Sequence, residues 1–527
     1  MKRIIALCAA LLIVAMLWLF WPLADKRLAI TIDERMRARR NDYLSGLTHR
    51  TGPNIVIIVA DDLSVYDVSR YGGTNVPTPN IDAIGAEGVT FTSAYCTSPI
   101  CAPSRSALLT GRYHQRSGFE FQPMTRYAKN RLEYYVYKNF IVDRAGDWQI
   151  APLGPVPPES ELVKQGMAVE EITLPEILSH SGYVTGITGK WHLGFGNERI
   201  PNARGFIEQY GFYEAFSLYT PVHDTNIVES RHRYFSDKHI WAQGRTGLCA
   251  IRRNDAVVDE KEYLTFAVAR EANAFITSNA AAKRPFMLYV PFNAPHTPFQ
   301  VPRSYYEKFP RVNDHNRRVY YAMIAALDDA VGSIMKTIRT NGLDENTLIF
   351  FASDNGAATY AGVDNFPLKF GKFTFFEGGI RVPFMMRWKG KVPAARVHTP
   401  VSLMDVFITA AQAAGVTLPT DRVYDGKDLM TLNRDVERPL FWRTLYVKAA
   451  RVGTWKLMVD ERAKRSYLFD IVADPGELND LSADHPRVVS DITARLAEWE
   501  KGLVPPRWPR VMDFRYYNEG VAHYFPL

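Results

Sequence analysis

Blocks of hydrophobic and polar positions along this chain predict a sheet with both faces covered. Residues 54–60 form a continuous, mostly β-branched run, which is typical of a fully buried strand. Three further apolar segments share that character, at residues 183–189, 285–292 and 347–352. Apolar positions repeat at helical spacing over residues 316–339, with Gly342 as the expected cap. Buried strands that alternate with helices predict an α/β fold with a large mixed, mostly parallel sheet flanked by helices.

The pattern changes in the last hundred residues. Three short segments at hairpin spacing predict strands at 442–446, 455–460 and 467–471, and a helix follows near 488–499. We therefore expect a small C-terminal α+β domain with an antiparallel sheet. The predicted units are a signal anchor or signal peptide (1–25), a polar, helical juxtamembrane linker (26–50), the large α/β domain (51–420) and the C-terminal domain (421–527).

The amino terminus is apolar enough to meet a membrane. Lys2 and Arg3 precede an apolar stretch from Ile4 to Leu23, and about 20 such residues can span a bilayer as a helix. No small-X-small cleavage site follows, so we expect an uncleaved signal anchor, with a cleaved signal peptide as the alternative. Basic residues beyond this stretch oppose a placement of the amino terminus on the cytoplasmic side by the positive-inside rule. Large domains, however, translocate largely regardless of such charge.

The chain contains no Asn-X-Ser/Thr acceptor, which favours a bacterial periplasm over a eukaryotic secretory route. We therefore expect an exported protein on the periplasmic side of the inner membrane. The N-terminal helix would anchor it there, or cleavage would release it.

Composition narrows the class of protein. At 527 residues, of which 47% are hydrophobic, the chain can bury a large core. The net charge of +7 is spread among nearly as many acids, so we expect no nucleic-acid partner, although a sulfated polyanion is compatible with it. Besides Cys8 in the apolar leader, the cysteines are Cys96, Cys101 and Cys249, too few for a disulfide scaffold or a cysteine-based zinc module.

Polar clusters follow each predicted buried strand, at the sheet edge where α/β proteins bind ligands. Asp61 and Asp62 follow the first strand, and Asp354 and Asn355 follow the last. Adjacent carboxylates repel each other, and a hard divalent cation with oxygen ligands would compensate them. A helix N-cap and a simple turn are the alternatives at the two positions.

An anion site is predicted around Cys101. The run Cys101-Ala-Pro-Ser-Arg105 precedes good helix formers that end at Gly111, so the thiol should lie just upstream of a helix N-terminus. The helix dipole and Arg105 both favour sulfate or phosphate there. An ordinary buried thiol, or a disulfide between Cys96 and Cys101, remains the alternative.

Two lysines and two histidines occupy the other strand ends and a nearby loop. Lys190 and His192 follow the strand at 183–189, His296 follows the strand at 285–292, and Lys372 precedes a Glu-Gly-Gly turn. A metal, an arginine and lysines would hold a tetrahedral anion, and histidines would transfer protons.

These residues, with Leu109-Thr-Gly-Arg112 closing the Cys101 motif, resemble the type I sulfatases of the alkaline phosphatase superfamily. The resemblance runs from about residue 53 through the C-terminal domain, and makes 51–420 the catalytic domain. It implies a sulfuric ester hydrolase, arylsulfatase-like, that cleaves an aryl or carbohydrate sulfate ester. It also implies a Cα-formylglycine, formed from Cys101 by a formylglycine-generating maturation enzyme, and a Ca²⁺ (or Mg²⁺) ion.

The resemblance also implies a role for each site residue. Asp61, Asp62, Asp354, Asn355 and position 101 would bind the metal. One hydroxyl of the formylglycine hydrate would attack sulfur, with His296 and Lys372 at the leaving oxygen. His192 would take the proton of the other hydroxyl and so release sulfate, while Arg105 and Lys190 would hold the hydrate and the charge.

Some positions and some alternatives stay open. Ser217 is a candidate sulfate contact, with a surface-loop serine as the alternative. A phosphonate monoester or phosphodiester hydrolase shares the Cys-X-Pro-Ser-Arg motif but typically lacks part of the histidine and lysine set. An inactive relative that binds sulfated glycans is the non-enzymatic alternative. We expect the rim of the substrate pocket to come from the 122–165 insertion, the 197–260 region and the C-terminal domain.

Overall fold

The computed structural model of the chain describes residues 2–23, 30–124, 128–142, 148–150, 157–221, 224–232, 235–432 and 436–527. A ten-stranded sheet forms its centre, in the order β14-β2-β13-β12-β1-β10-β5-β6-β8-β9. The four predicted buried strands are confirmed as β1 (Asn54–Ala60), β5 (Val184–Lys190), β10 (Phe286–Pro291) and β12 (Thr347–Ser353).

These four strands lie side by side and run parallel. β1 pairs with β10 on one side and with β12 on the other, and β10 pairs with β5. Their carboxyl ends therefore meet at one edge of the sheet, which brings together the polar clusters that follow them. β6 (Glu208–Phe212) continues the parallel part, whereas β13 (Phe384–Arg387) and β2 (Val89–Phe91) pair in antiparallel fashion beyond β12. The mixed, mostly parallel sheet is thus confirmed.

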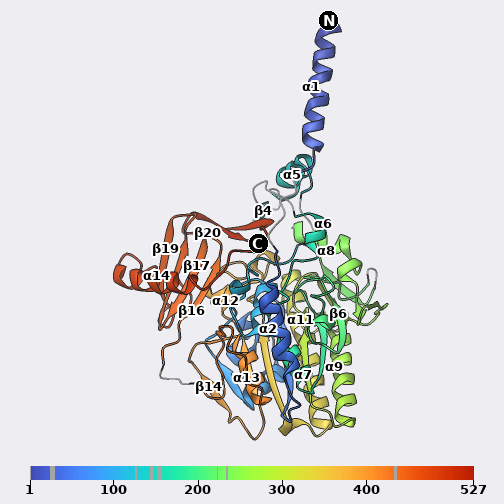
Figure 1. Cartoon of the computed structure of the whole chain (residues 1–527), viewed down its shortest axis with the longest axis vertical. Coiled ribbons are helices and arrows are strands. Elements are labelled where there is room, and N and C mark those ends of the chain that lie inside the picture. The colour runs from blue at the N-terminus through green and yellow to red at the C-terminus, as the bar shows by residue number, and fades with distance from the viewer. Residues whose placement is uncertain are drawn as a thin grey trace.

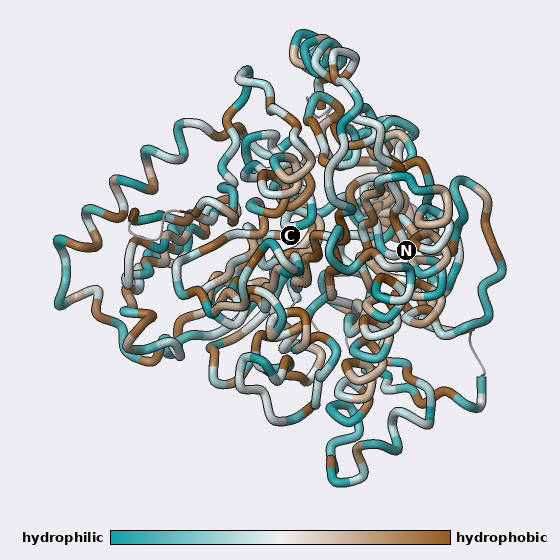
Figure 2. The backbone as a smooth tube through the Cα atoms, turned by 90° about the horizontal axis from the view of Figure 1, so that it is seen from below, coloured by the Kyte–Doolittle hydropathy of each residue, from teal (hydrophilic) through white to brown (hydrophobic). Residues whose placement is uncertain are grey.

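Helices enclose this sheet. Every residue of β1, β10 and β12 is buried, as their apolar sequences require. The predicted helix is confirmed as α11 (His315–Thr340), and it packs on α9 (Leu264–Ala281). Three other helices pack on one another as a second group: α4 (Cys101–Thr110), α7 (Leu174–His180) and α13 (Asp405–Ala413). Asn341 caps α11, and Gly342 follows with φ +70°. In Figure 2, many hydrophobic stretches of the backbone lie in the interior of the molecule, and hydrophilic loops lie around them.

Two smaller sheets involve the carboxyl-terminal part of the chain. Strands β16 (Leu440–Thr444), β17 (Val447–Val452), β18 (Trp455–Asp460) and β19 (Arg465–Asp470) form an antiparallel sheet against which α14 (Pro486–Glu500) packs. The sequence pattern missed β17. It also missed the hairpin of β20 (Met512–Asn518) and β21 (Val521–Pro526), which pairs with β4 (Trp148–Ile150) from the predicted insertion (Figure 1).

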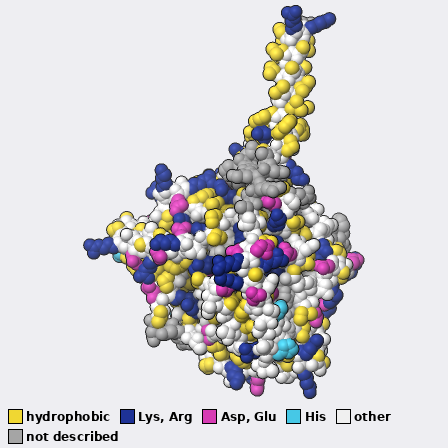
Figure 3. Space-filling view, viewed as in Figure 1, with side chains coloured by type: hydrophobic (Ala, Val, Ile, Leu, Met, Phe, Trp, Pro, Cys, Tyr) yellow, Lys and Arg dark blue, Asp and Glu magenta, His cyan; other side chains and the backbone are white. Residues whose placement is uncertain are grey.

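The amino-terminal helix α1 (Lys2–Phe20) extends away from the body (Figure 1). It is the one helix in the described part of the chain that is long and apolar enough to cross a membrane, which is compatible with a signal sequence or an anchor. Hydrophobic side chains cover it and basic ones lie at its tip (Figure 3). Residues 24–29 of the predicted linker lie outside the described residues.

The rest of the predicted linker is part of the body. The helix expected there is α2 (Glu34–Ser45), and it packs on α7, with Arg40 paired to Glu176 at 2.6 Å. The hydroxyl group of Tyr43 donates a hydrogen bond to the carbonyl oxygen of Thr417. From about residue 30 onward, therefore, this stretch is attached to the large domain and does not behave as a spacer.

Candidate active site

Two neighbouring strands carry the predicted acidic cluster. Asp61 and Asp62 follow β1, and Asp354 and Asn355 follow β12. The backbone N–H of Asp354 bonds to the carbonyl oxygen of Ala60, so the two loops leave the sheet together. Asp62 has φ +62°, a left-handed conformation that aspartate tolerates better than most residues. These four side chains are buried at one place on the sheet edge.

Helix α4 brings Cys101 to this edge. The thiol is in the first residue of the helix and not upstream of it as expected, because Ile100 is the N-cap. Gly111 caps the helix at φ +68°, as predicted. The Cys101 Sγ lies 3.3 Å from Asp61 Oδ1 and 3.2 Å from Lys372 Nζ. Cys96 and Cys101 are both free, so the alternative disulfide does not form.

Three basic side chains pair with the carboxylates. Lys190 Nζ is 2.6 Å from Asp61 Oδ2, and Lys372 Nζ is 2.8 Å from Asp62 Oδ1. Arg105 Nε is 2.7 Å from Asp354 Oδ2. The sequence pattern predicts a metal cation as the group that compensates the carboxylates. In the structure the three charge pairs are buried together and balance one another.

The donor set nevertheless suits a hard divalent cation. One ligand atom from each of Asp61, Asp62, Cys101 and His296 lies within 4.8 Å of the others. Asn355 donates its amide to Asp62 at 2.6 Å, while its Oδ1 is buried and has no hydrogen-bond partner among the described residues. A buried amide oxygen without a partner next to carboxylates is the kind of ligand that Ca²⁺ and Mg²⁺ prefer. The residues present therefore fit such an ion.

Both histidines are held in their neutral form. Burial lowers the pKa of His192 well below 6.5, and the nearby Lys190 and Arg105 act in the same direction. Burial and Lys372 also lower the pKa of His296, which lies 3.7 Å from Asp62. The Nδ1 of His296 contacts the carbonyl oxygen of Thr297, which can only accept, so Nδ1 carries the proton. Its Nε2 is therefore the nitrogen that faces the site.

The unmodified thiol is a poor nucleophile here. Burial and the negative charge of Asp61 raise the pKa of Cys101 well above its ordinary value, despite Lys190 and Lys372 nearby. The thiolate is the reactive form of cysteine, and this environment disfavours it.

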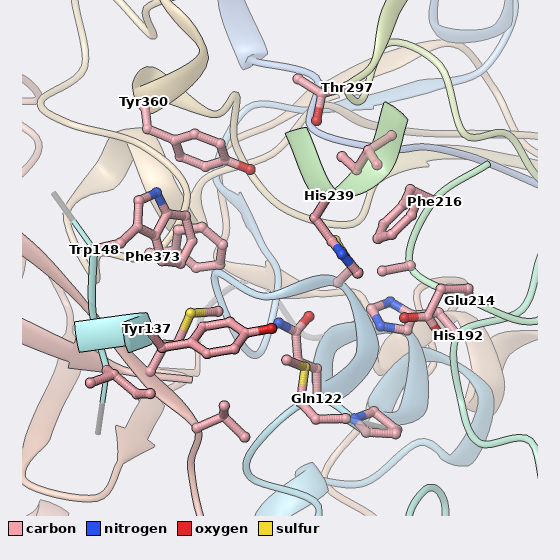
Figure 4. A pocket seen from close by; sticks show the side chains of 18 of the residues that line it. Gln122, Tyr137, Trp148, His192, Glu214, Phe216, His239, Thr297, Tyr360 and Phe373 are labelled. Carbon is pink, nitrogen blue, oxygen red and sulfur yellow. The ribbon is translucent and has the colours of Figure 1, made fainter. Parts of the chain in front are cut away.

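The site lies at the floor of a cavity of about 490 Å³. Cys101, His192, His296 and Lys372 line it, together with residues of all three predicted rim segments. In Figure 4, Tyr137, Trp148, Tyr360 and Phe373 extend into the pocket from one side, and His192, Glu214, Phe216 and His239 from the other. The walls are largely apolar and aromatic. This outcome confirms that parts of the insertion, of the 197–260 region (residues 214–216 and 239–240) and of the C-terminal domain line the pocket.

Comparisons with known proteins agree with this geometry. The sulfatase family profile matches residues 53–416. An N-acetylgalactosamine-6-sulfatase of Canis lupus familiaris is 32% identical over 501 residues, which cover 86% of this chain and 87% of the relative. The crystal structure of Ps i-CgsB in complex with k-i-k-neocarrahexaose has a TM-score of 0.72 and 31% identity, and the match covers 87% of this chain and 95% of that one. The chain belongs to the sulfatase family.

Membership establishes that this sulfatase is a sulfuric ester hydrolase. A further relative is Arylsulfatase J of Mus musculus, 28% identical over 539 residues, with 91% of this chain and 79% of the relative covered.

Sequence reasoning misplaced one candidate of the sulfatase site and missed several others. Ser217 is neither a pocket residue nor a surface serine, because it is buried and donates to the carbonyl oxygen of Cys249 at 2.7 Å. Thr297 lines the pocket and could have been inferred from its neighbour His296. His239 lies on α8 (Phe235–Gln243), far from any predicted strand end, and only the expected place of the 197–260 region at the rim pointed toward it.

Proposed function

We propose that this sulfatase cleaves an aryl or carbohydrate sulfate ester with a formylglycine at position 101 and a bound Ca²⁺ or Mg²⁺ ion. The observation that carries the proposal is the place of Cys101, buried between a carboxylate and a lysine at the floor of the cavity. The relatives support the substrate class, since one is named for a sulfated amino sugar and another is an arylsulfatase.

Asp61, Asp62, Asp354, Asn355 and position 101 would hold the metal ion. A bound divalent cation would stabilise the negative charge of the sulfate oxygens and the hydrate. As it stands the site pairs three carboxylates with three basic groups, so a divalent cation would leave it net positive. The positive charge would attract a sulfate ester, and Lys190 and Lys372 would then be available to the substrate.

A formylglycine hydrate would supply two hydroxyl groups. One would form the new O–S bond and pass its proton to the adjacent Asp61 carboxylate, and the other would allow sulfate to be eliminated afterwards. Lys372 and His296 would bind the ester oxygen and give it a proton as the S–O bond to the alcohol breaks. Sulfate next to His296 favours its protonated form, which opposes the effect of burial. His192, neutral and buried, would accept the proton of the second hydroxyl as the C–O bond to sulfate breaks.

Mass spectrometry of the peptide that contains position 101 tests the nucleophile. The peptide should be lighter than the cysteine form by the thiol-to-aldehyde change when the protein is made beside a formylglycine-generating enzyme. Unmodified cysteine in fully active protein would contradict the proposal. So would a Cys101→Ala variant that hydrolysed 4-nitrophenyl sulfate as fast as the parent.

A direct comparison of esters tests the alternative chemistry. The phosphonate or phosphodiester hydrolase shares the nucleophile, but this chain has the complete set: His192, His296 and Lys372 line the cavity, and Lys190 is buried beside them on Asp61. We expect 4-nitrophenyl sulfate to be turned over faster than 4-nitrophenyl phenylphosphonate by the same preparation. The reverse order would favour the alternative.

We further propose that α1 anchors the protein on the periplasmic side of a bacterial inner membrane. Its apolar composition and exposed surface support attachment to a membrane, and the lack of an Asn-X-Ser/Thr acceptor supports the bacterial periplasm. Membrane fractionation tests it. The full-length protein should remain with inner membranes in carbonate and dissolve in detergent, whereas release by carbonate would contradict anchoring.

A further inference from the structure

One wall of the active-site cavity is the segment that holds the end of α1. Lys129, Glu133 and Tyr137 line the cavity. The N–H of Leu23, three residues beyond α1, donates to the carbonyl oxygen of Lys129 at 3.0 Å, and Pro22 forms a β-bridge with Asn130. The residues just after α1 therefore contact this wall directly.

The helix α5 (Arg131–Val136) continues the contact. It packs on α1, and the Arg131 guanidinium stacks 4.9 Å above the ring of Trp18. At 1.5 Å per residue, the 19 residues of α1 span about 28 Å, close to the thickness of the hydrocarbon core. If α1 crosses a bilayer, α5 and the cavity wall lie at the headgroup level.

Residues around this contact have the composition of a membrane interface. Trp18 and Trp21 are 51% and 66% exposed, and Phe140 in the π-helical segment Tyr137–Val142 is 62% exposed. Val136 is also exposed, and Lys138 supplies a basic group. Exposed aromatic and basic side chains next to a spanning helix are typical of a surface that contacts lipid headgroups. We define Val136, Lys138 and Phe140, with Trp18 and Trp21, as the membrane-contact surface.

The cavity above the catalytic floor is also suited to an apolar group. Met124, Ile150 and Met512 line it together with the aromatic side chains of Tyr137 and Trp148. Met512 belongs to β20 and Ile150 to β4, so this wall is the surface of a small sheet. The segment that contacts α1, with Lys129 and Tyr137, continues the wall. Polar side chains such as Gln122, Glu214 and His239 also line the cavity, and a ligand with one charged and one apolar end would place its charged end at the catalytic floor and its apolar end against this wall.

We propose that the membrane-contact surface rests on the bilayer and that the sulfatase acts on amphiphilic sulfate esters resident in that bilayer. The sulfated head would enter the cavity while the apolar part stays in or near the lipid. This inference rests on the proposed function and specifies its substrate class. It also requires that α1 remains on the mature protein.

The test uses the full-length protein reconstituted in vesicles of phosphatidylcholine and phosphatidylglycerol, with two esters assayed side by side. One is 4-hexadecylphenyl sulfate embedded in the vesicles, and the other is soluble 4-nitrophenyl sulfate. The double variant Val136→Ser, Phe140→Ser should lower turnover of the embedded ester about tenfold, because two apolar side chains no longer enter the interface, with little change for the soluble ester. Val257→Ser, which alters a residue 62% exposed on the distant edge strand β9 (Ala256–Val257), is the matched control and should change neither rate.

The outcomes separate this inference from the function on which it rests. Equal loss for both esters in the double variant, or no loss for the embedded ester, overturns the membrane-contact surface. A mature amino terminus that begins beyond Leu23 overturns it as well. Turnover of 4-nitrophenyl sulfate by the parent without turnover of the embedded ester overturns the substrate class alone. Absence of both activities in protein modified at position 101 contradicts the proposed function itself.

Discussion

At the scale of single residues, the site contains buried carboxylates that stay charged because each is paired with a basic side chain. Asp61, Asp62 and Asp354 lie out of contact with water, and each is within 3 Å of a lysine or arginine nitrogen. Ionised groups are costly to bury unless they are paired, so each of these residues requires its partner. The same positive groups help to keep both histidines neutral before substrate binds, which suits His192 as the proton acceptor.

The first prediction concerns His192. Because burial and Lys190 lower its pKa, the imidazole stays neutral as the pH falls below 6.5, and activity should persist there until the lowered pKa is reached. The acid limb of kcat for 4-nitrophenyl sulfate should therefore lie below pH 6.5. A His192→Ala variant should lose kcat by about 10²- to 10⁴-fold, the usual effect of a proton-transfer residue. A limb centred above the ordinary pKa of histidine would contradict this role.

At the scale of elements, two contacts between distant segments complete parts of the site that the loops after the central strands do not supply. The strand β4 joins β20 and places Trp148 over the pocket, although the two strands are more than 350 residues apart in sequence. The turn after β19 carries Glu477, whose Oε2 accepts the N–H of Glu377 at 2.6 Å and whose carbonyl oxygen accepts from Lys369. These two contacts flank the loop that presents Lys372, so the C-terminal part of the chain positions a residue of the site.

The second prediction concerns Trp148. Its ring packs edge-on against Tyr360, Phe373 and Phe514 and lines the cavity away from the catalytic floor. Trp148→Ala should raise KM for 4-nitrophenyl sulfate about fivefold, since aromatic contacts contribute on the order of 1 kcal/mol, while kcat changes little. Trp455→Ala on β18, remote from the pocket, should leave KM unchanged. Steady-state kinetics that showed a fall in kcat alone would contradict a binding role.

At the scale of the whole molecule, one buried cluster joins the C-terminal sheet to the large domain. Lys456 on β18 is fully buried and lies 2.9 Å from Glu377 and 2.8 Å from Glu477. Glu377 in turn accepts from the hydroxyl group of Tyr95 beside the central sheet. Removal of the lysine would leave two carboxylates facing each other without water.

The third prediction follows from this cluster. Lys456→Met should lower the free energy of unfolding by about 3–5 kcal/mol, the usual effect of breaking a buried ion pair from one side. The control Lys501→Met removes a mostly exposed pair with Glu498 and should cost less than about 1 kcal/mol. Urea unfolding measures both. Equal stability of the two variants would show that the cluster does not hold the domains together.

The fourth prediction concerns the proposed metal ion, which would connect β1, β12 and α4. Calcium at about 100 times its Kd should stabilise the folded protein by about 2.7 kcal/mol, because the ion binds the folded state only. Differential scanning calorimetry should show a higher Tm with Ca²⁺ than after chelation, and this difference should disappear in Asp62→Asn. An identical Tm in both conditions would argue against the site.

Sequence alone determined the elements whose physics is local. Continuous β-branched runs are typical of strands in a sheet that is covered on both faces, so the four strands beside the site were predictable. The helix at 316–339 was predictable from its apolar spacing, and the errors lie at the ends of these elements. Parallel strands place their carboxyl ends together, and this was sufficient to predict that Asp61, Asp354, Lys190 and His296 lie at one edge of the sheet.

Tertiary structure decided what depends on contacts between distant segments. The sequence carries no periodic signal for a strand as short as β4, and only its pairing with β20 makes it one. Likewise, that Lys190 and Lys372 pair with the carboxylates, that Ser217 turns away to Cys249, and that the pocket wall holds α1 are consequences of packing. Local pattern fixes which segments are buried, whereas the partner of each buried polar group depends on which segments the fold brings together.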